Sequence, residues 1–572
     1  KCGLCVTTCG DLAGQSVWEI HDRGASIRIQ PSDGLSLADT TCTACGACID
    51  HCPTGALREK KGHGPTAESP KATGSVCGVC SVGCRIEIET ADEDIRRIFG
   101  PPQSATNPAG LLCQKGKFSF GFNGRWDRLT KPMLRLGAGF REVSWEEAFQ
   151  FIESALIRIV NAHGPGAFAA VASPRASTES NYLLQKFCRS VVGSPHVDCT
   201  ARFDHAATLT ALRQFFGVGA ATASFADIDD ATCLVIAGAD PDASHPVLAS
   251  RIRQSVARGA ALIVIDPRRT ALAAQADLHL AAPPGEDLAL FEATASRLTQ
   301  HGLHHTPPTD ADRLASALLR HRGSTVFLPG TGLSEVATIG TFLRLAHLTG
   351  NLGRKGAGVL PFGGQNNLQG CWDAGAAPEL LPGQRDISDA EARARIEDLW
   401  GRCLPEERGF TLPEMISAIQ EKRLRAMWVL GNDPSQRLGG DALKPLDLLV
   451  VQDLFYSDTS RHAHVLLPAA SAFEQSGVFI NAERRAQLIR PALPPSEEAR
   501  PDWAILTVMA RRLGAEWPYL DAAQVFAELS LVAPDLFAGI THRRLEESSD
   551  GLQWPCPDED HPGTPTLPID SR

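Results

Sequence analysis

The sequence contains no run approaching the ~20 consecutive apolar residues that a membrane helix requires, so no transmembrane segment is expected. It also lacks an excess of positive charge: 55 Lys and Arg face 66 Asp and Glu, a formal net charge of −11, which argues against nucleic acid as a partner. No intact G-x-G-x-x-G or P-loop is present, so an ordinary dinucleotide or ATP site is not indicated. With 43% hydrophobic and 21% charged residues, the 572-residue chain is neither disordered nor collagen-like, and its length suggests about three or four domains.

Cysteine is present in quantity and is unevenly spread. Of 17 cysteines, eleven lie in the first 113 residues: Cys2, Cys5, Cys9, Cys42, Cys45, Cys48, Cys52, Cys77, Cys80, Cys84 and Cys113. The chain opens directly on one of these groups rather than on a leader peptide. Dense C-x-x-C groups in a large chain indicate metal binding rather than disulfides, and a reducing, cytoplasmic location is expected. The other six are expected to be buried structural thiols: Cys188, Cys199, Cys233, Cys371, Cys403 and Cys556.

Residues 42–53 have the spacing C-x2-C-x2-C-x3-C-P of a [4Fe–4S] ferredoxin. Residues 2–9 match the last three cysteines of a second such run, whose first cysteine would precede the sequence, so we expect the protein to continue upstream. In two-cluster ferredoxins the fourth cysteine of each run binds the other cluster. Zinc also accepts four thiolates and is the alternative, but the doubled run and Pro53 favour iron–sulfur.

A third motif follows residues 58–75, which are rich in Lys, Gly, Pro and Ser and are predicted to be a linker. Cys77, Cys80 and Cys84 are separated from Cys113 by 28 residues, and Lys115 follows two positions later. We expect the intervening residues to form a small β-layer that returns Cys113 to the same cluster. The alternative is two unrelated cysteine pairs.

From about residue 130 the pattern changes to alternating helices and strands. Ser144 and Glu147 form a predicted capping box for a helix through about residue 160, and residues 246–260 predict another helix. Short apolar runs predict buried parallel strands at 232–238, 261–266, 426–431 and 447–453.

Two of these strands end alike, in Gly238-Ala239-Asp240-Pro241 and in Gly431-Asn432-Asp433-Pro434. The next strand ends in an aspartate each time: Asp266 lies 26 residues after Asp240, and Asp453 lies 20 after Asp433. Glycine allows a ligand to approach the backbone, and an acid about twenty residues later suits a ribose hydroxyl or a guanine edge. We infer two related half-sites for nucleotides. The alternative is two similar turns in unrelated α/β units.

Together these motifs resemble the molybdenum/tungsten bis-pterin-guanine-dinucleotide oxidoreductases, most closely the alpha subunit of NAD-linked formate dehydrogenases. The first 57 residues also resemble the ferredoxin-like part of the large iron–sulfur subunit of complex I. The resemblance covers nearly the whole chain, in stretches such as NYLLQKF (181–187), VDCTARFDH (197–205), GADPDASHP (238–246), GQNNLQG (364–370), GNDP (431–434) and GVFINAERR (477–485).

The resemblance implies an α/β fold: an N-terminal ferredoxin-like two-cluster domain, then a molybdopterin-oxidoreductase-type multi-domain fold with parallel sheets. The expected domains are 1–57 for two clusters, the linker 58–75, 76–131 with parts of 477–572 for the third cluster, 132–199 with 366–476 for one half-site, and 200–365 for the other. The family's C-terminal domain that closes over the pterins is absent from this sequence.

The resemblance also implies residue roles. Lys115 would bridge the third cluster and a pterin, and the nucleotide sites would be lined by Gly238, Asp240, Asp266, Gln365, Asn366, Gly431, Asp433 and Asp453. The reaction would oxidise formate to carbon dioxide. Electrons would pass through three [4Fe–4S] clusters to flavin- and NAD-binding and iron–sulfur partner subunits of a larger complex.

Two positions depart from the family. Asp204 stands where its selenocysteine or cysteine binds the metal, although His205 is retained, and Gly363 stands where its arginine binds formate. Arginine grips a carboxylate with two charge-assisted hydrogen bonds, which glycine cannot do. Asp204 and His205 are candidate catalytic residues, or else plain buried residues of an emptied site. Cys199 could substitute as a metal ligand, but a structural thiol is favoured.

We therefore predict an iron–sulfur electron-transfer subunit of a formate-dehydrogenase-like complex. The alternative is an active molybdenum or tungsten formate dehydrogenase with an altered metal site. A mainly structural scaffold is disfavoured because the cluster spacing of the cysteines is retained. The sequence leaves open whether a bis-molybdopterin guanine dinucleotide with molybdenum or tungsten is bound.

Overall fold

The computed structural model describes residues 2–59, 69–299 and 307–569. The chain divides into two compact units: unit 1 contains Lys1–Gly121, His205–Gly364 and Pro565–Arg572, and unit 2 contains Phe122–Asp204 and Gln365–Thr564. The domain boundaries predicted from the sequence are finer than this division and stay predictions. In the described residues no single helix is long and apolar enough to cross a membrane, although one pair, Ala522–Val532 with Pro534–Glu547, passes together with a 113° bend.

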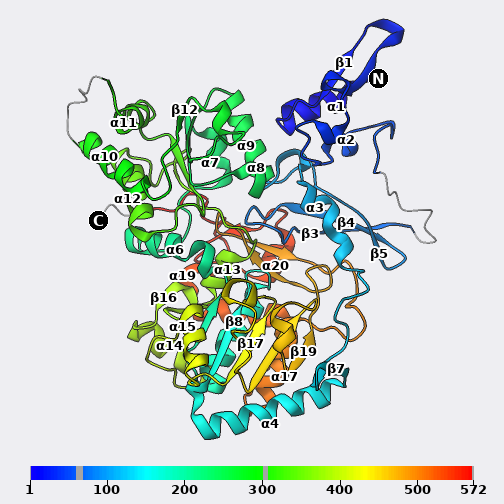
Figure 1. Ribbon diagram of the computed structural model, residues 1–572, viewed down its shortest axis with the longest axis vertical. Helices are drawn as coiled ribbons and strands as arrows, with labels where there is room; N and C mark the ends of the chain where they lie inside the picture. The colour runs from blue at the N-terminus through cyan, green and yellow to red at the C-terminus, as the bar shows by residue number, and fades with distance from the viewer. Residues whose placement is uncertain (1, 60–68, 300–306, 570–572) are drawn as a thin grey trace. The chain divides into compact units, whose positions relative to one another are not determined.

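Unit 1 begins with short elements that surround the cysteine motifs (Figure 1). The helices are α1 (Leu4–Thr7), α2 (Ala47–Asp50) and α3 (Gln114–Phe118), and the strands are the antiparallel pair β1 (Trp18–His21) and β2 (Arg28–Pro31) and the antiparallel sheet β3 (Lys71–Val76), β4 (Arg85–Ala91) and β5 (Asp94–Phe99). β4 and β5 supply the β-layer expected between Cys84 and Cys113.

The linker prediction is wrong at its end. Residues 71–75 belong to β3, which pairs with β4 from Lys71 opposite Thr90 to Val76 opposite Arg85. The small and polar residues suggested a loop, but backbone pairing to a neighbouring strand decides the structure and does not depend on propensity alone. The middle of the predicted linker, 60–68, lies outside the described residues.

The second part of unit 1 is a parallel five-stranded sheet in the order β12-β11-β10-β13-β14. Its strands are β10 (Cys233–Ala237), β11 (Ala261–Ile265), β12 (Leu278–Leu280), β13 (Thr325–Pro329) and β14 (Gly358–Val359). The helices of this part are α7 (Phe225–Asp230), α8 (Pro241–Ser244), α9 (Pro246–Ala257), α10 (Asp287–Thr299), α11 (Asp310–Arg320) and α12 (Val336–Leu348). Phe291, Leu314 and Phe342 from α10, α11 and α12 pack in one buried cluster with Val235 and Ile263 of the sheet. This burial explains why the strands are continuously apolar.

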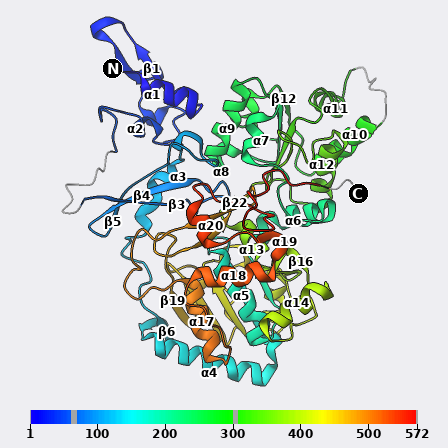
Figure 2. The same ribbon diagram turned by 180° about the vertical axis from the view of Figure 1, so that it is seen from behind.

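Unit 2 is built on a seven-stranded sheet in the order β7-β6-β19-β18-β17-β8-β9. Its strands are β6 (Met133–Leu136), β7 (Gly139–Glu142), β8 (Phe168–Ala172), β9 (Val197–Cys199), β17 (Ala426–Leu430), β18 (Leu448–Asp453) and β19 (Val465–Pro468). β19 to β9 run parallel, whereas β6 and β7 add an antiparallel edge. Leu412 and Met415 of α15 (Leu412–Gln420) pack in one buried cluster with Val171 and Met427 of the sheet. Figure 2 shows α17 (Asp502–Arg512) and α18 (Ala522–Val532) in front of the same sheet.

The predicted α/β pattern is confirmed in both units. The four predicted strands are β10, β11, β17 and β18, within two residues at each end, and the predicted helices are α9 and α4 (Trp145–His163). The capping box is only half present: Ser144 Oγ accepts the Glu147 N–H at 3.2 Å, but the Glu147 carboxylate pairs with Arg141.

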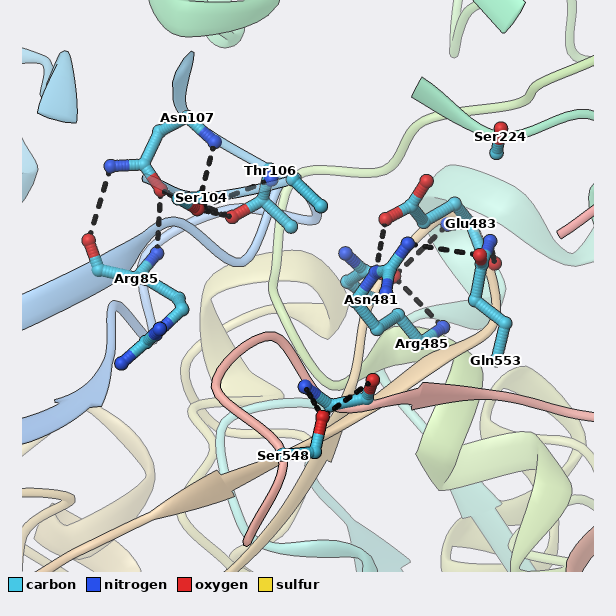
Figure 3. A network of polar contacts seen from close by, with 12 residues as sticks. Arg85, Ser104, Thr106, Asn107, Ser224, Asn481, Glu483, Arg485, Ser548 and Gln553 are labelled. Atoms are coloured by element: carbon cyan, nitrogen blue, oxygen red, sulfur yellow. Dashed lines mark hydrogen bonds and ion pairs between the residues drawn. The ribbon is translucent and has the colours of Figure 1, made fainter. Parts of the chain in front are cut away.

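A smaller antiparallel sheet in unit 2 contains the GVFINAERR stretch. It consists of β20 (Gly477–Ile480), β21 (Arg485–Ile489) and β22 (Leu552–Gln553). In the turn between β20 and β21, Asn481 Oδ1 accepts the N–H groups of Glu483 and Arg485 at 3.1 and 3.0 Å (Figure 3). The Arg485 guanidinium donates to Gln553 Oε1 at 2.9 Å and so ties β21 to β22. The other helices of unit 2 are α5 (Thr178–Lys186), α13 (Leu368–Asp373), α14 (Ala390–Trp400), α16 (Ser435–Leu438), α19 (Pro534–Phe537) and α20 (His542–Glu547), and α6 (Arg202–Phe216) begins at its boundary.

Candidate cofactor sites

The third cysteine motif forms one compact group in unit 1. A Cβ atom placed on Gly116 would lie 3.4 Å from Cys77 Sγ and 3.9 Å from Cys113 Sγ, so both sulfurs flank the same glycine. Burial, with a smaller contribution from the charge of Cys113, raises the pKa of the Cys80 thiol to about 12. Burial likewise raises the pKa of Cys84, where the nearby sulfurs are those of Cys77, Cys80 and Cys113. The four thiols thus lie within electrostatic reach of one another.

The side chain of Asn107 links the two ends of the segment between Cys84 and Cys113. Its Oδ1 accepts the Arg85 N–H at 2.8 Å, and its Nδ2 donates to the Arg85 carbonyl at 3.1 Å (Figure 3). Ser104 Oγ donates to the same Oδ1 at 2.8 Å. The buried amide therefore joins the segment before Cys113 to the backbone directly after Cys84, which brings the fourth cysteine back to the first three.

The ferredoxin-like cysteines form two groups that exchange their last members. Burial raises the pKa of the Cys48 thiol to about 11, and the neighbouring sulfurs that contribute to this shift are those of Cys45, Cys9 and Cys42. Burial also raises the pKa of Cys5, whose neighbouring sulfurs are those of Cys2 and Cys52. Cys9 of the first run thus joins the second group, and Cys52 of the second run joins the first. This is the crossed pattern of a two-cluster ferredoxin.

The thiol groups fit [4Fe–4S] clusters. Backbone N–H groups donate to four sulfurs: Val17 to Cys9 at 3.3 Å, and Ala44 to Cys42, Leu57 to Cys52 and Gly116 to Cys113 at 3.4 Å each. Such N–H···S bonds stabilise thiolates and tune cluster potentials. In the part of the chain that the structure describes, no three Cys, His, Asp or Glu side chains are placed to bind a single ion.

The first half-site lies in unit 1 at the carboxyl end of β10. Gly238 has φ +62°, and a Cβ there would lie 2.8 Å from the Leu333 backbone nitrogen, so the turn requires glycine. Asp240 follows it, and its Oδ1 is buried without a hydrogen-bond partner among the described residues. Asp266, at the end of β11, is 2% exposed, and both its oxygens accept from Arg268, at 2.9 to 3.0 Å. The orphaned oxygen of Asp240 fits a ligand that donates a hydrogen bond.

The second half-site lies in unit 2 around a pocket of about 380 Å³. It is lined by Arg175, Thr200, Asp204, Gln365, Gly431, Asn432, Asp433, Gln436, Arg437 and Asp453. Asp433 accepts three hydrogen bonds from the following loop: Oδ1 from Thr459 N at 2.9 Å and Oγ1 at 2.6 Å, and Oδ2 from Asp458 N at 3.2 Å. Burial raises the pKa of Asp453 to about 6, and Arg175 opposes this shift. The polar lining fits a nucleotide.

Asp204 lies in this pocket, bound to an arginine that the sequence did not indicate. Arg437 Nη2 lies 3.0 Å from Asp204 Oδ1, and the Asp204 side chain is 41% exposed. Asp204 is therefore not a plain buried residue. Arg437 is recognised as the partner of Asp204 only from their hydrogen bond in the folded structure, because the two residues lie 233 positions apart and no local motif includes Arg437.

The remaining predicted residues lie as follows. In unit 1, His205 is buried, and burial, with a smaller contribution from the charge of His245, lowers its pKa to about 4. Lys115 is exposed, and its charge lowers the pKa of Cys80 against the larger effect of burial. In unit 2, Asn366 is fully buried. Of the six remaining cysteines, Cys403 is exposed and the other five are buried, which corrects the prediction for Cys403.

Gly363, where the sequence resemblance places the formate-binding arginine, is held by two residues that sequence reasoning missed. His245 Nε2 donates to the Gly363 carbonyl at 2.7 Å, and the Gly363 N–H donates to Ser81 Oγ at 3.0 Å. Ser81 follows Cys80 directly, so the backbone at Gly363 is fixed beside the third cysteine motif.

Comparison with known families agrees with this arrangement. Residues 128–512 match the family Molybdopterin oxidoreductase. The chain belongs to the molybdopterin oxidoreductases. Residues 70–123 match the Molybdopterin oxidoreductase Fe4S4 domain, and residues 39–58 match a 4Fe-4S binding domain. The fold class and the expected [4Fe–4S] clusters of this molybdopterin oxidoreductase are thereby confirmed, and the family supports the molybdopterin cofactor that the sequence left open.

Individual relatives point the same way. The chain is 31% identical to the probable oxidoreductase YjgC of Bacillus subtilis, over 97% of this chain but 64% of that protein. It is 34% identical to the F420-dependent formate dehydrogenase subunit alpha of Methanocaldococcus jannaschii, over 87% of this chain and 78% of the relative. Among solved structures, acetylene hydratase from Pelobacter acetylenicus shares the fold, with a TM-score of 0.64 at 19% identity over 84% of this chain and 73% of that chain.

Proposed function

We propose that this molybdopterin oxidoreductase is the electron-transfer subunit of a formate-dehydrogenase-like complex. When bound, three [4Fe–4S] clusters supply one-electron transfer, and a metal–pterin supplies two-electron redox chemistry. Cys77, Cys80, Cys84 and Cys113 would hold one cluster. Cys9, Cys42, Cys45 and Cys48 would hold the second, and Cys2, Cys5 and Cys52 would contribute to the third. Lys115 would provide a polar group between the first cluster and a bound pterin. The proposed location is the cytoplasm, and the proposed partners are flavin- and NAD-binding and iron–sulfur subunits.

The observation that carries the proposal is the pairing of Asp204 with Arg437. Formate must bring a negative charge into the site, and burying a carboxylate is costly without a paired cation. Gly363 provides no cation, and the charge of Arg437 is already matched by Asp204. The other arginine of the pocket, Arg175, acts on Asp453. Arg437 is thus already paired with a carboxylate of the chain, and Asp453 lies close enough to Arg175 for their charges to interact, which disfavours formate.

A second candidate function is formate oxidation with an altered metal site. Asp204 favours it, because a partly exposed carboxylate at the family's metal-ligand position can offer a hard oxygen ligand. His205 follows it as in the family. The relatives named formate dehydrogenase alpha subunits agree with this alternative.

Turnover of the anaerobically purified full-length protein separates the two functions. We expect no formate-dependent reduction of an artificial acceptor, in wild type and in Gly363→Arg alike, because Asp204 still replaces the soft ligand. Formate-dependent dye reduction with about one molybdenum or tungsten per chain would establish the second function instead.

Iron analysis tests the electron-transfer role directly. Three clusters predict about 12 irons per chain when the upstream cysteine is present. Cys113→Ser should remove one reduced-cluster EPR signal and leave the others. About four irons per chain would mean that the ferredoxin-like cysteines hold no clusters, and the role as an electron relay would be excluded.

A further inference from the structure

Lys117 is a buried cation that joins two of the cysteine groups in unit 1. It lies in α3, four residues after Cys113, and its backbone N–H donates to the Cys113 carbonyl at 3.0 Å. Its side chain is 1% exposed. The ammonium donates to Asp50 Oδ1 at 2.6 Å and to the Ile98 carbonyl at 3.2 Å. Asp50 belongs to α2 and lies between Cys48 and Cys52.

The stem of Lys117 passes directly over the ferredoxin-like cysteine loop. A Cβ on Gly46 would lie 2.5 Å from Lys117 Cδ and 2.6 Å from Cε, so Gly46 leaves the space that the lysine stem occupies. Gly46 also has φ +75° and links Cys45 to the start of α2. The lysine therefore begins beside Cys113 and ends beside the loop that contains Cys45 and Cys48.

Packing alone does not explain a charge at this position. Removing an ammonium from water is costly, and replacing a buried ion pair by an apolar side chain of similar volume is often neutral or stabilising. Methionine would fill the same space over Gly46. A fixed positive charge next to a cluster, in contrast, has a specific electrostatic effect, because reduction adds one negative charge to the cluster.

We propose that Lys117 is a positioning residue for electron transfer: its charge raises the reduction potential of the cluster at Cys9, Cys42, Cys45 and Cys48 and so directs electrons to it from the cluster at Cys113. The inference rests on the proposed electron-transfer function. Each step moves one electron, oxidising the cluster at Cys113 and reducing the other, and no bond breaks. Asp50 fixes the ammonium in place and offsets part of its charge.

The test is an EPR-monitored redox titration of the full-length protein and its variants. The signal of the cluster at Cys45 is identified as the one that Cys45→Ser removes. Lys117→Met keeps the stem and removes the charge, so this potential should shift to a more negative value. Asp50→Asn leaves the ammonium uncompensated, so the same potential should shift to a more positive value. The double variant should lie between the two.

Opposite shifts distinguish an electrostatic role from a structural one. Lys355→Met is the matched control, since Lys355 is 80% exposed in a surface ion pair of the same unit, and it should leave every potential unchanged. Unchanged potentials, or shifts of the same sign in Lys117→Met and Asp50→Asn, would overturn the role of Lys117. If Lys117→Met loses iron, the potential shifts of Asp50→Asn and of the double variant decide whether Lys117 acts electrostatically. Absence of the ferredoxin-like clusters from the wild type would instead refute the proposed function.

Discussion

The two half-sites carry the same G-x-D-P turn but use its aspartate in opposite ways. In unit 2, Asp433 accepts three hydrogen bonds from the loop at residues 458–459. In unit 1, the equivalent Asp240 keeps a buried Oδ1 without a partner among the described residues. The aspartates at the ends of the following strands differ as well. Asp266 forms an ion pair with Arg268, whereas Asp453 is buried, and its burial raises its pKa.

The motif therefore serves the fold in unit 2, whereas in unit 1 it leaves a carboxylate oxygen that a ligand could satisfy. A carboxylate that satisfies loop N–H groups stabilises the protein and has little capacity left for a ligand. A buried oxygen without a partner lowers stability unless a ligand donates to it, and unsatisfied groups of this kind are concentrated at functional sites. The four predictions below test this division.

The largest effect is expected at Asp433. Asp433→Ala removes three hydrogen bonds from partly buried donors, so the free energy of unfolding should fall by about 1–3 kcal/mol. Denaturant titration measures this change, and Asp240→Ala is the matched control, with an expected change below about 0.5 kcal/mol. An equal loss of stability in both variants would remove the distinction between the half-sites.

Asp240→Ala should instead reduce cofactor retention. The variant loses the hydrogen bond that a ligand would donate to this oxygen, so guanine nucleotide released by acid hydrolysis of the purified protein should decrease by about half, the share of one half-site. Asp240→Asn, which keeps an acceptor oxygen, should retain more nucleotide than the alanine variant. Full retention in Asp240→Ala would show that Asp240 holds no ligand.

Nucleotide retention at the unit 2 half-site should depend on pH. Burial raises the pKa of Asp453 to about 6, and its ionised form accepts N–H donors of a base. Retention should therefore be complete above pH 6 and weaken as the pH falls below it. The contribution of this carboxyl to stability has the opposite sign: it is fully present below about pH 4, the ordinary pKa of an unfolded carboxyl, and is lost as the pH rises through 6, since the unfolded carboxyl ionises first. Dialysis at pH 5 and pH 7.5 followed by nucleotide analysis measures retention, and Asp453→Asn should abolish its pH dependence.

The smallest effect is expected at Arg268. Its side chain is 64% exposed, so the ion pair with Asp266 contributes little stability. Arg268→Ala frees the Asp266 carboxylate, and nucleotide retention in unit 1 should increase slightly, with the free energy of unfolding changed by less than about 1 kcal/mol. A marked loss of nucleotide would show that Arg268 itself contacts the ligand.

The sequence predicts the strands and the glycines of these sites well, because continuous apolar runs and G-x-D-P turns are local signals. It does not predict the partners. Arg268 lies only two residues from Asp266, yet nothing in its pattern distinguishes a partner of the acid from a ligand-binding group. Arg437 meets Asp204 only through the tertiary fold. The same limit applies to β3, whose pairing with β4 overrides a linker-like composition.

Segments of the two units alternate along the chain, so the ribosome makes part of unit 1 between two parts of unit 2. β8 pairs with β17, and Phe168 lies opposite Ala426, so the sheet of unit 2 cannot close until 258 further residues have been made. At ~5–20 residues per second, the ribosome leaves β8 without this partner for roughly 10–50 s. Residues 205–364, which carry the sheet of unit 1, emerge entirely during this interval. During translation, the nascent chain therefore exposes an apolar strand of unit 2 while the sheet of unit 1 is completed.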